Sequence, residues 1–477
     1  MKLAKSLLLG SAAGFAVAAG AQAADLPVKK AAAVEYVRVC STYGAGFFYI
    51  PGTETCLRVS GRVRAEYRYL EPFSRAADAI GFRARGRLNL DARTATAYGL
   101  LRAYARFEIT RNSGVYTAFG QINSDPQIQQ AFIQFGGLTA GRVTSFFSNP
   151  DLPTQHMGTL RFDDAPDVTL LAYTYSFGNG FSATLSMEDG LERRNNSLLP
   201  FNNLAVPGVN FPALPFVYGG ERMPDVVANV RYAGTWGGVQ LSGAVHQIRE
   251  VGTFNVNPLT GVPLPVVDDS DYGFAVGLSG YVNLPVLGAG DAAWVFATYT
   301  DGATAYINGG QSGPSGNQSI FAGPFNSPFT DAVINPFTGD FKTTRAWSIA
   351  GGITHNWTPE FRSSIFGSYA RWEAPSIASF VVPITPATLA NGTAGSVGGL
   401  FDFNEYRIGA NSFWSPIAGL NLGVEVLYTY VDPKNRVAIP VTDVTGVRQI
   451  APGGIPLFKL TGSEDIWEGR LRVQRDF

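Results

Sequence analysis

Apolar and polar residues alternate along much of this chain, most clearly at its C-terminus. One set of alternate residues there is mostly apolar, with aromatic residues at both ends, and the residues between them are all polar. The first set is Phe477, Arg475, Val473, Leu471, Gly469 and Trp467, and the second is Asp476, Gln474, Arg472, Arg470 and Glu468. A period of two predicts an extended strand with one dry and one wet face. A strand of roughly 9–11 such residues can cross a membrane as part of a barrel.

The same alternation recurs throughout the chain, and helical periodicity is scarce. In 59–69, for example, Val63, Ala65 and Tyr67 alternate with arginines and a glutamate. Similar segments cover 82–91, 100–109, 226–232, 240–246, 272–279, 405–411 and 421–430. The chain is therefore expected to be all-β.

The connections between these segments fall into two length classes. Short, turn-like sequences are expected at 91–94, 136–137, 178–180, 236–238, 358–359 and 415–418, since they hold the residue types of tight hairpins. Long Pro/Gly/Asn-rich stretches lie near 190–224, 251–269, 302–342, 374–402 and 433–462. Outer-membrane barrels combine short periplasmic turns with longer external loops. We therefore expect a transmembrane antiparallel up-and-down β-barrel of about sixteen strands over 57–477.

Tyrosine and tryptophan residues gather near the expected strand ends. They are Tyr67, Tyr69, Tyr232, Trp347, Trp357, Trp372, Trp414, Tyr428, Tyr430 and Trp467. We expect them to form the aromatic girdles of a barrel at the two membrane interfaces, since ordinary barrel packing explains their positions less well.

The N-terminal residues indicate export. A basic start, an apolar run from Ser6 to Ala19 and the sequence Ala21-Gln22-Ala23 predict a signal peptide over 1–23. No later run reaches the roughly 18 apolar residues of a membrane-spanning helix. Residues 24–56 are expected to form an N-terminal segment on the periplasmic side. The chain has only two cysteines, Cys40 and Cys56, and in an oxidising compartment they are expected to form a disulfide.

Charge and residue types exclude several other functions. A formal net charge of −1 argues against a nucleic-acid partner. His156, His246 and His355 are far apart and lack metal-ligand spacing, so no metal or cofactor is expected. We expect His246 to be a polar pore-lining residue.

Arginines dominate the polar face of the first three expected strands. They are Arg62, Arg64, Arg68, Arg83, Arg85, Arg87, Arg102 and Arg106. Because adjacent strands lie about 4.8 Å apart, these residues form one basic wall, which in a barrel lines the pore. Packed like charges repel one another and therefore need counter-charge nearby.

The segment from Phe147 to Pro166 is a candidate source of that counter-charge. It and its C-terminal flank contain the acids Asp151, Asp163, Asp164 and Asp167. If the segment folds inward, its acids face the arginine wall and narrow the pore, so that small hydrated solutes pass. If it stays outside, they are surface acids. Position and charge alone leave both alternatives open.

Three stretches resemble the alphaproteobacterial general porins. They are 34–67, from Val34-Glu35-Tyr36 through both cysteines to Glu66-Tyr67; 130–142, Gln130-Ala131-Phe132 to Gly141-Arg142; and 473–477. The resemblance brackets nearly all of the expected mature chain. It implies a sixteen-stranded outer-membrane barrel of a Gram-negative bacterium and usually a homotrimer. It also implies passive diffusion of ions and small hydrophilic solutes, with the third external loop folded into the lumen. The terminal Phe477 resembles a barrel-assembly signal.

Three other functions remain as alternatives to a diffusion porin. A ladder of lumen aromatics would favour a substrate-specific channel for a sugar or an anionic nutrient, but only Tyr104 is evident and no clear ladder is present. An outer-membrane barrel hydrolase would need a Ser–His pair, and no G-x-S-x-G sequence is present. A soluble lectin-like β protein would not need detergent for extraction. We expect a channel rather than an enzyme.

Overall fold

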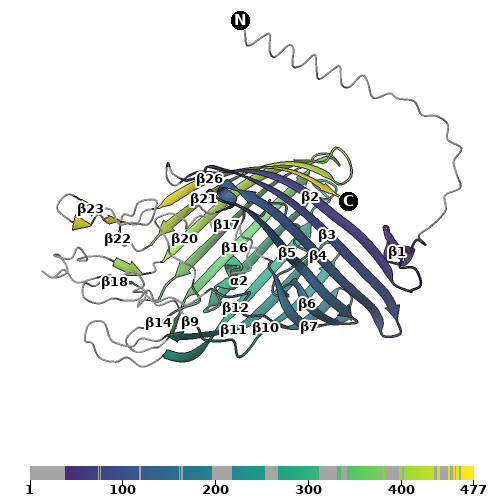
Figure 1. The fold of residues 1–477 in the computed structure, drawn as a ribbon, viewed down its shortest axis with the longest axis horizontal. Coiled ribbons are helices and arrows are strands. Elements are labelled where there is room, and N and C mark those ends of the chain that lie inside the picture. The colour runs from purple at the N-terminus through teal and green to yellow at the C-terminus, as the bar shows by residue number, and fades with distance from the viewer. Residues whose placement is uncertain are drawn as a thin grey trace, which may run out of the picture.

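The computed structural model forms one closed antiparallel β-barrel (Figure 1). The structure describes residues 38–477 except 73–74, 76, 118–119, 161, 163–164, 196–216, 253–266, 311–329, 335–340, 376–378, 382–396, 400–401, 435–437, 441–449, 452–454, 457 and 461–462. The expected signal peptide, residues 1–23, therefore lies outside the described residues, as do parts of the long connections.

Sixteen strands make up the barrel, as the alternation predicts. They are β2 (Cys56–Leu70), β3 (Ile80–Thr96), β4 (Gly99–Ser113), β5 (Ile122–Phe135), β6 (Leu138–Thr144), β7 (Asp167–Gly178), β8 (Phe181–Glu188), β10 (Asp225–Gly234), β11 (Gly237–Gly252), β12 (Val267–Asn283), β13 (Ala292–Asp301), β16 (Arg345–Asn356), β17 (Phe361–Glu373), β20 (Phe403–Trp414), β21 (Leu420–Pro433) and β26 (Glu464–Asp476). Each pairs with the next, so the backbone hydrogen bonds run around the barrel.

Smaller elements flank the barrel. Strands β1 (Phe47–Tyr49) and β9 (Val217–Tyr218) pair with β2 and β11, and four two-stranded pieces lie in the long connections. These pieces are β14 (Ala332–Ile334) with β15 (Phe341–Thr343), β18 (Ser379–Val381) with β19 (Val397–Gly399), β22 (Ala438–Pro440) with β25 (Phe458–Leu460), and β23 (Ile450–Ala451) with β24 (Ile455–Pro456). The helical turns are η1 (Ser41–Tyr43), η2 (Gly114–Tyr116) and α2 (Ala305–Asn308). Within the described part of the chain, no helix has the length and apolar character to cross a membrane.

The barrel closes between its first and last strands. Strand β26 pairs with β2 from Arg62–Asp476 to Leu70–Glu468 and with β21 on its other side, as expected for a closing strand. Phe477 extends this pairing, because it exchanges both backbone hydrogen bonds with Gly61, at 2.8 and 3.1 Å. At the same end, Arg475 donates a hydrogen bond to the Ala418 carbonyl in the β20–β21 turn. The two chain ends of the barrel therefore lie on the side of the short turns.

Short and long connections alternate around the barrel, with two differences from expectation. The expected turn at 91–94 is wrong: β3 continues to Thr96, and the chain turns at Ala97-Tyr98. Asp91 stays in the strand because the pairing of β3 with both β2 and β4 continues past it, and its carboxylate accepts hydrogen bonds from Arg93 and Arg102. The connection between β12 and β13, residues 284–291, was not expected, although it belongs to the short class.

The two faces of the strands differ in exposure. Large apolar residues at alternate positions, such as Val63, Leu471 and Val473, are about half exposed and form the outer face. The residues between them are mostly buried or half-buried and face inward. Trp372 is a correction to the expected girdles: it is only 2% exposed and stacks on Phe403 within an interior cluster.

The segment before β2 is held to the barrel by the expected disulfide. Cys40 and Cys56 are bonded, and both are buried with Phe47. Since Cys56 is the first residue of β2, the bond ties residues 40–55 to the end of that strand.

Replacing Gly61 tests the closure. A side chain there would begin 2.4 Å from the Phe477 ring and 2.7 Å from the Arg87 carbonyl oxygen. We expect Gly61→Val to cost about 1–3 kcal/mol, as overpacking does, and to lower the temperature at which the folded gel band is lost. The control is Gly86→Val on β3, where an added Cβ meets no atom within 4 Å. Equal behaviour of the two variants would contradict this account of the closure.

Candidate functional site

The eight arginines of the expected basic wall lie on three adjacent strands. Register pairs Arg62 with Arg87 and Arg64 with Arg85 between β2 and β3, and β4 continues the array with Arg102 and Arg106. Their positions alternate with those of exposed apolar residues, so these arginines share one face of the sheet. The structure thus brings all eight onto three neighbouring strands.

Counter-charge for the arginines comes first from the strands themselves. Asp91 binds Arg93 and Arg102 through paired hydrogen bonds of 2.7–3.1 Å. Other ion pairs are Arg62–Asp476 at 2.5 Å, Arg68–Glu468 at 2.7 Å, Arg85–Glu108 at 3.0 Å, Arg87–Glu108 at 2.7 Å and Arg472–Glu66 at 2.5 Å. Sharing of carboxylates lets the strands hold closely spaced guanidinium groups, because opposite charges offset their repulsion.

Three of the arginines have only neutral acceptors among the described residues. Arg64 donates to Gln474 at 2.9 Å, and Arg83 donates to Asn112 at 2.7 Å. Arg106 donates to Asn89 and to the Tyr104 hydroxyl. The wall therefore keeps an excess of positive charge.

Two of the four acids expected to face this wall, Asp151 and Asp167, contact residues outside it. Asp151 pairs with Arg231 of β10, which is not a member of the wall. Asp167 is the first residue of β7 rather than part of the loop, and its carboxylate accepts hydrogen bonds from Gln129 and Gln130. Asp163 and Asp164 lie outside the described residues. The strand acids Glu66 and Glu108, visible on the polar face in the sequence, are the counter-charges that the loop-based argument missed.

The β6–β7 segment, residues 145–166, is anchored at its middle by charged side chains of distant strands. Glu425 of β21 accepts hydrogen bonds from the Met157 amide, at 2.7 Å, and from the Thr159 hydroxyl. The Met157 carbonyl in turn accepts from Arg470 and Arg472 of β26, at 2.7 and 2.9 Å. Arg407 of β20 donates to the Thr159 carbonyl at 2.5 Å.

The start of the same segment is held by another group of strands. Glu188 of β8 accepts from the Ser145 hydroxyl, at 2.6 Å, and from the Phe146 amide. The Phe146 carbonyl accepts from Asn229 of β10, at 2.6 Å, and from Gln240 of β11. Side chains of six barrel strands therefore bind the backbone or hydroxyls of one short segment.

Apolar contacts complete the anchoring. Phe147 belongs to a buried cluster with Val227, Ala275, Phe296 and Tyr306. Leu160 and Phe162 belong to a second cluster, which also contains Trp294, Ile307, Ala346, Ala350, Phe366, Ala370, Trp372, Phe403, Leu427 and Val431. Gly277 gives the Phe147 ring its space, because an added Cβ would lie 3.0 Å from that ring.

The sequence argument missed this apolar inner surface. Its signal is a local loss of alternation: Phe366, Ala370 and Trp372 of β17 are apolar, and so are Ile365 and Tyr369, which belong to the other set of alternate positions. Strand β13 has the same feature, with Trp294 and Phe296 on either side of Val295. Apolar residues on both faces indicate a strand that is covered by other protein on its inner side.

His246 is not an open pore-lining residue in the described structure. It is 1% exposed, and its Nδ1 lies 2.7 Å from a carboxylate oxygen of Asp225. The other oxygen of Asp225 accepts from the Tyr306 hydroxyl at 2.6 Å. The expectation fails because Tyr306 and Asp331, from the connection between β13 and β16, lie against Asp225 and His246.

Removing the Glu425 carboxylate tests how the β6–β7 segment is held. Losing a buried hydrogen-bonding group costs about 1–3 kcal/mol, so we expect Glu425→Ala to speed amide hydrogen exchange of residues 145–160. Glu373→Ala is the matched control, since Glu373 forms only a partly exposed pair with Arg371. Unchanged protection in Glu425→Ala would show that the carboxylate does not anchor the segment.

Comparison with known proteins identifies the family. The family model described as a porin subfamily matches residues 25–449. Porin Omp2b of Brucella suis is 38% identical over 246 residues, which cover 49% of this chain and 64% of the relative. Porin Omp2b of Brucella abortus (strain 2308) is 38% identical over 247 residues with the same coverage. These alignments thus span less than two thirds of the curated relatives.

A solved structure agrees in fold. The crystal structure of the outer membrane channel DcaP of Acinetobacter baumannii has a TM-score of 0.55 and 15% sequence identity, and the match covers 90% of this chain and 99% of that chain. At this identity the likeness concerns the fold alone. From the family match and the sixteen-stranded barrel together, the chain belongs to the porin subfamily of Gram-negative outer-membrane proteins.

Proposed function

We propose that this protein is a water-filled channel for the passive diffusion of ions and small hydrophilic solutes. The observation that carries the proposal is a closed barrel of sixteen strands whose inward positions hold charged and polar side chains. Barrels of this size leave an aqueous channel, whereas barrels of about eight strands fill with side chains. Membership of the porin subfamily supports a channel rather than an enzyme.

We further propose that the β6–β7 segment folds into the lumen and narrows it. Its hydrogen bonds with β10 and β11 on one side and with β20, β21 and β26 on another support this arrangement. In the sheet order, these two groups of strands are separated by several others in both directions. A short segment that reaches both groups has its most direct path across the barrel interior.

The arginine array then forms the charged wall of the pore. Its excess of guanidinium groups raises the local concentration of anions and slows cations. The shared carboxylates keep the side chains extended along the wall, so the charge is fixed in place. The narrowing by the β6–β7 segment would act on solute size, and the wall would act on charge.

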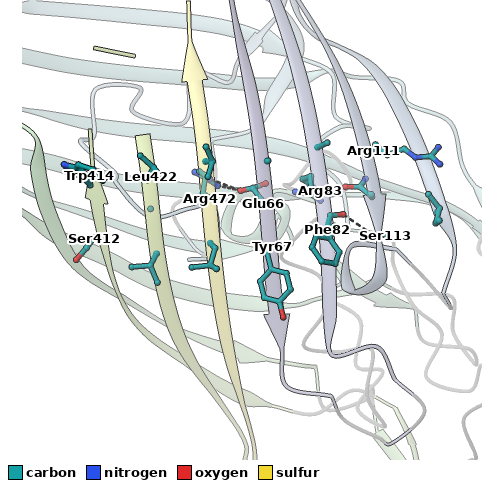
Figure 2. A pocket seen from close by; sticks show the side chains of 18 of the residues that line it. Glu66, Tyr67, Phe82, Arg83, Arg111, Ser113, Ser412, Trp414, Leu422 and Arg472 are labelled. Carbon is teal, nitrogen blue, oxygen red and sulfur yellow. Dashed lines mark hydrogen bonds and ion pairs between the residues drawn. The ribbon is translucent and has the colours of Figure 1, made fainter. Parts of the chain in front are cut away.

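We also propose that three copies associate through the outer face around the closing strands. Residues of β20, β21, β26, β2, β3 and β4 line a groove (Figure 2). Its apolar lining includes Tyr67 and Phe82, whose rings pack edge to face at 5.3 Å, and Leu471, and it is deepened by the small residues Ala65 and Ala84. A grooved surface can pack against protein more closely than against mobile lipid chains.

Planar-bilayer conductance of the purified protein tests the channel. We expect stepwise currents in symmetric salt, with steps grouped in threes if the trimer inserts as a unit. A current that saturates with the concentration of one sugar or anion would instead indicate a substrate-specific channel. A protein that binds bilayers and carries no current would contradict the proposed function.

Neutralising part of the wall tests its electrostatic role. Two unit charges 4 Å apart in water interact by about 1 kcal/mol, so we expect Arg83→Gln, Arg85→Gln and Arg87→Gln together to shift the cation-to-anion permeability ratio toward cations by about fivefold or more. Reversal potentials in asymmetric salt measure the shift. Arg371→Gln, which removes an arginine paired with Glu373 at the end of β17, is the control. An unchanged reversal potential in the triple variant would refute the basic wall.

Filling the groove tests the trimer. We expect Ala84→Trp to weaken the trimer band in mild detergent, while heat-modifiable monomers show that the barrel still folds. Val276→Trp is the control, because Val276 is exposed on β12, away from the groove. If the trimer of Ala84→Trp were as stable as that of the wild type, the contact between copies of the chain would lie on another part of the outer face.

A further inference from the structure

A second external connection contributes to the buried interior. The long connection between β13 and β16 begins with Gly302, whose amide bonds to the Thr344 carbonyl, and continues into α2. Helix α2 has one turn, and its residues Ala305, Tyr306 and Ile307 are all buried. It ends at Gly309, whose φ of 81° is left-handed and suits glycine. The turn is therefore packed against protein rather than exposed to solvent.

Tyr306 is the residue of α2 with the most specific contacts. Its ring meets Phe147 of the β6–β7 segment edge to face, with centroids 4.7 Å apart. Its hydroxyl donates to Asp225 of β10 at 2.6 Å. Burial, assisted by the Asp225 carboxylate, raises the pKa of Tyr306 well above its usual range, so the phenol keeps the proton that it donates. One side chain thus joins the barrel wall to the β6–β7 segment.

The turn that carries Tyr306 is itself fixed by a buried carboxylate. Asp331 accepts from the Thr304 amide at 2.6 Å and from the Thr304 hydroxyl at 2.8 Å. The same carboxylate accepts from the Asn195 amide at 2.7 Å, and the Asn195 side chain donates to Thr304 and Asn308. The residues on both sides of α2 and the segment after β8 are thereby locked together.

Two further contacts link this assembly to the β6–β7 segment. Arg193, which is fully buried, lies over the Tyr306 ring at 4.7 Å and over the Phe147 ring at 6.0 Å. Ile307 belongs to the same buried cluster as Leu160 and Phe162. The α2 turn therefore contacts Phe147 near the start of the segment and shares a buried cluster with residues near its end.

We propose that Tyr306 is a positioning residue that holds the β6–β7 segment through Phe147, so that two external connections together set the width of the pore. This inference rests on the proposed function, in which the β6–β7 segment narrows a diffusion channel. Tyr306 packs edge to face against the Phe147 ring, and the same ring lies beside Gly277 of β12. The ring of Phe147 thus has contacts with both the barrel wall and α2, and these contacts restrict the backbone next to it.

The physical basis is that Tyr306 reduces the number of conformations open to the β6–β7 segment. An edge-to-face aromatic pair adds to the burial of both rings, and the hydrogen bond to Asp225 prevents the tyrosine from turning away. Without the Tyr306 ring, Phe147 gains space on one side, and the segment around it samples wider positions. Average pore width then rises, although the barrel strands keep all their pairings.

Single-channel conductance and size exclusion of the full-length protein in planar bilayers test the proposal. We expect Tyr306→Ala to raise the conductance about 1.5-fold, since pore width at the narrowest point limits the current. The same variant should admit larger poly(ethylene glycol) molecules than the wild-type channel does. Tyr306→Phe keeps the ring contact but loses the hydrogen bond to Asp225, so its exclusion limit should lie between those of the wild type and Tyr306→Ala. The matched control is Tyr299→Ala, because Tyr299 is exposed on β13, the strand that leads into this connection.

A double-mutant cycle separates positioning from general damage. Phe147→Ala should resemble Tyr306→Ala, and the double variant should show no more than the larger single effect. The temperature at which the folded gel band is lost should equal that of the wild type in both single variants and in the double variant. If Tyr306→Ala does not fold, Tyr306→Leu, which keeps apolar volume and loses the ring contact, takes its place. The role of Tyr306 would be overturned if a folded Tyr306 variant that lacks the ring contact had the conductance and exclusion limit of the wild type. Additive effects on conductance in the double variant would overturn it as well. A wild-type protein without channel activity would instead overturn the proposed function itself.

Discussion

The pairing of β2 with β26 is the constraint on which the rest of the structure depends. In hydrocarbon, every backbone amide and carbonyl needs a protein partner, so an open sheet edge cannot remain. The exchange of hydrogen bonds between Gly61 and Phe477 completes that pairing at the end of the chain. Once the sheet is closed, alternation separates the side chains into an outer apolar face and an enclosed polar one. The chemistry of the interior follows from this separation.

Enclosure brings many charges close together, and the strands balance most of them locally. Asp91, Glu108 and Glu66 each lie against more than one arginine, so a few carboxylates hold many guanidinium groups. Pairs whose carboxylates are buried in this way stabilise little by themselves, because desolvation offsets much of the attraction. They act mainly by fixing the positions of the arginine side chains, because paired and shared hydrogen bonds leave these side chains few rotamers. In the proposed channel, such fixed positive charge would act on passing ions.

The interior is not polar throughout. Apolar side chains of β13, β16, β17, β20 and β21 form a buried cluster with Leu160 and Phe162 of the β6–β7 segment. The same segment satisfies its backbone with Glu425, Arg470 and Arg472, which therefore serve as loop anchors as well as charges. Packing and hydrogen bonding act on one short stretch of chain from several strands. Such a stretch has a single position, unlike a loop that is tethered only at its ends.

The sequence alone determined the barrel, its strand number and closing strand, the alternation of short and long connections, the disulfide and the arginine array, because period-two patterning is local and repeats in every strand. It could not determine which carboxylate meets which arginine, since Glu108 and Arg87 become neighbours only through strand register. Nor could it show that Asp167 begins a strand, that Trp372 faces inward, or that His246 is covered by a loop. Tyr306, Phe147 and Gly277 lie more than a hundred residues apart at their extremes, and only the closed tertiary structure brings them into contact.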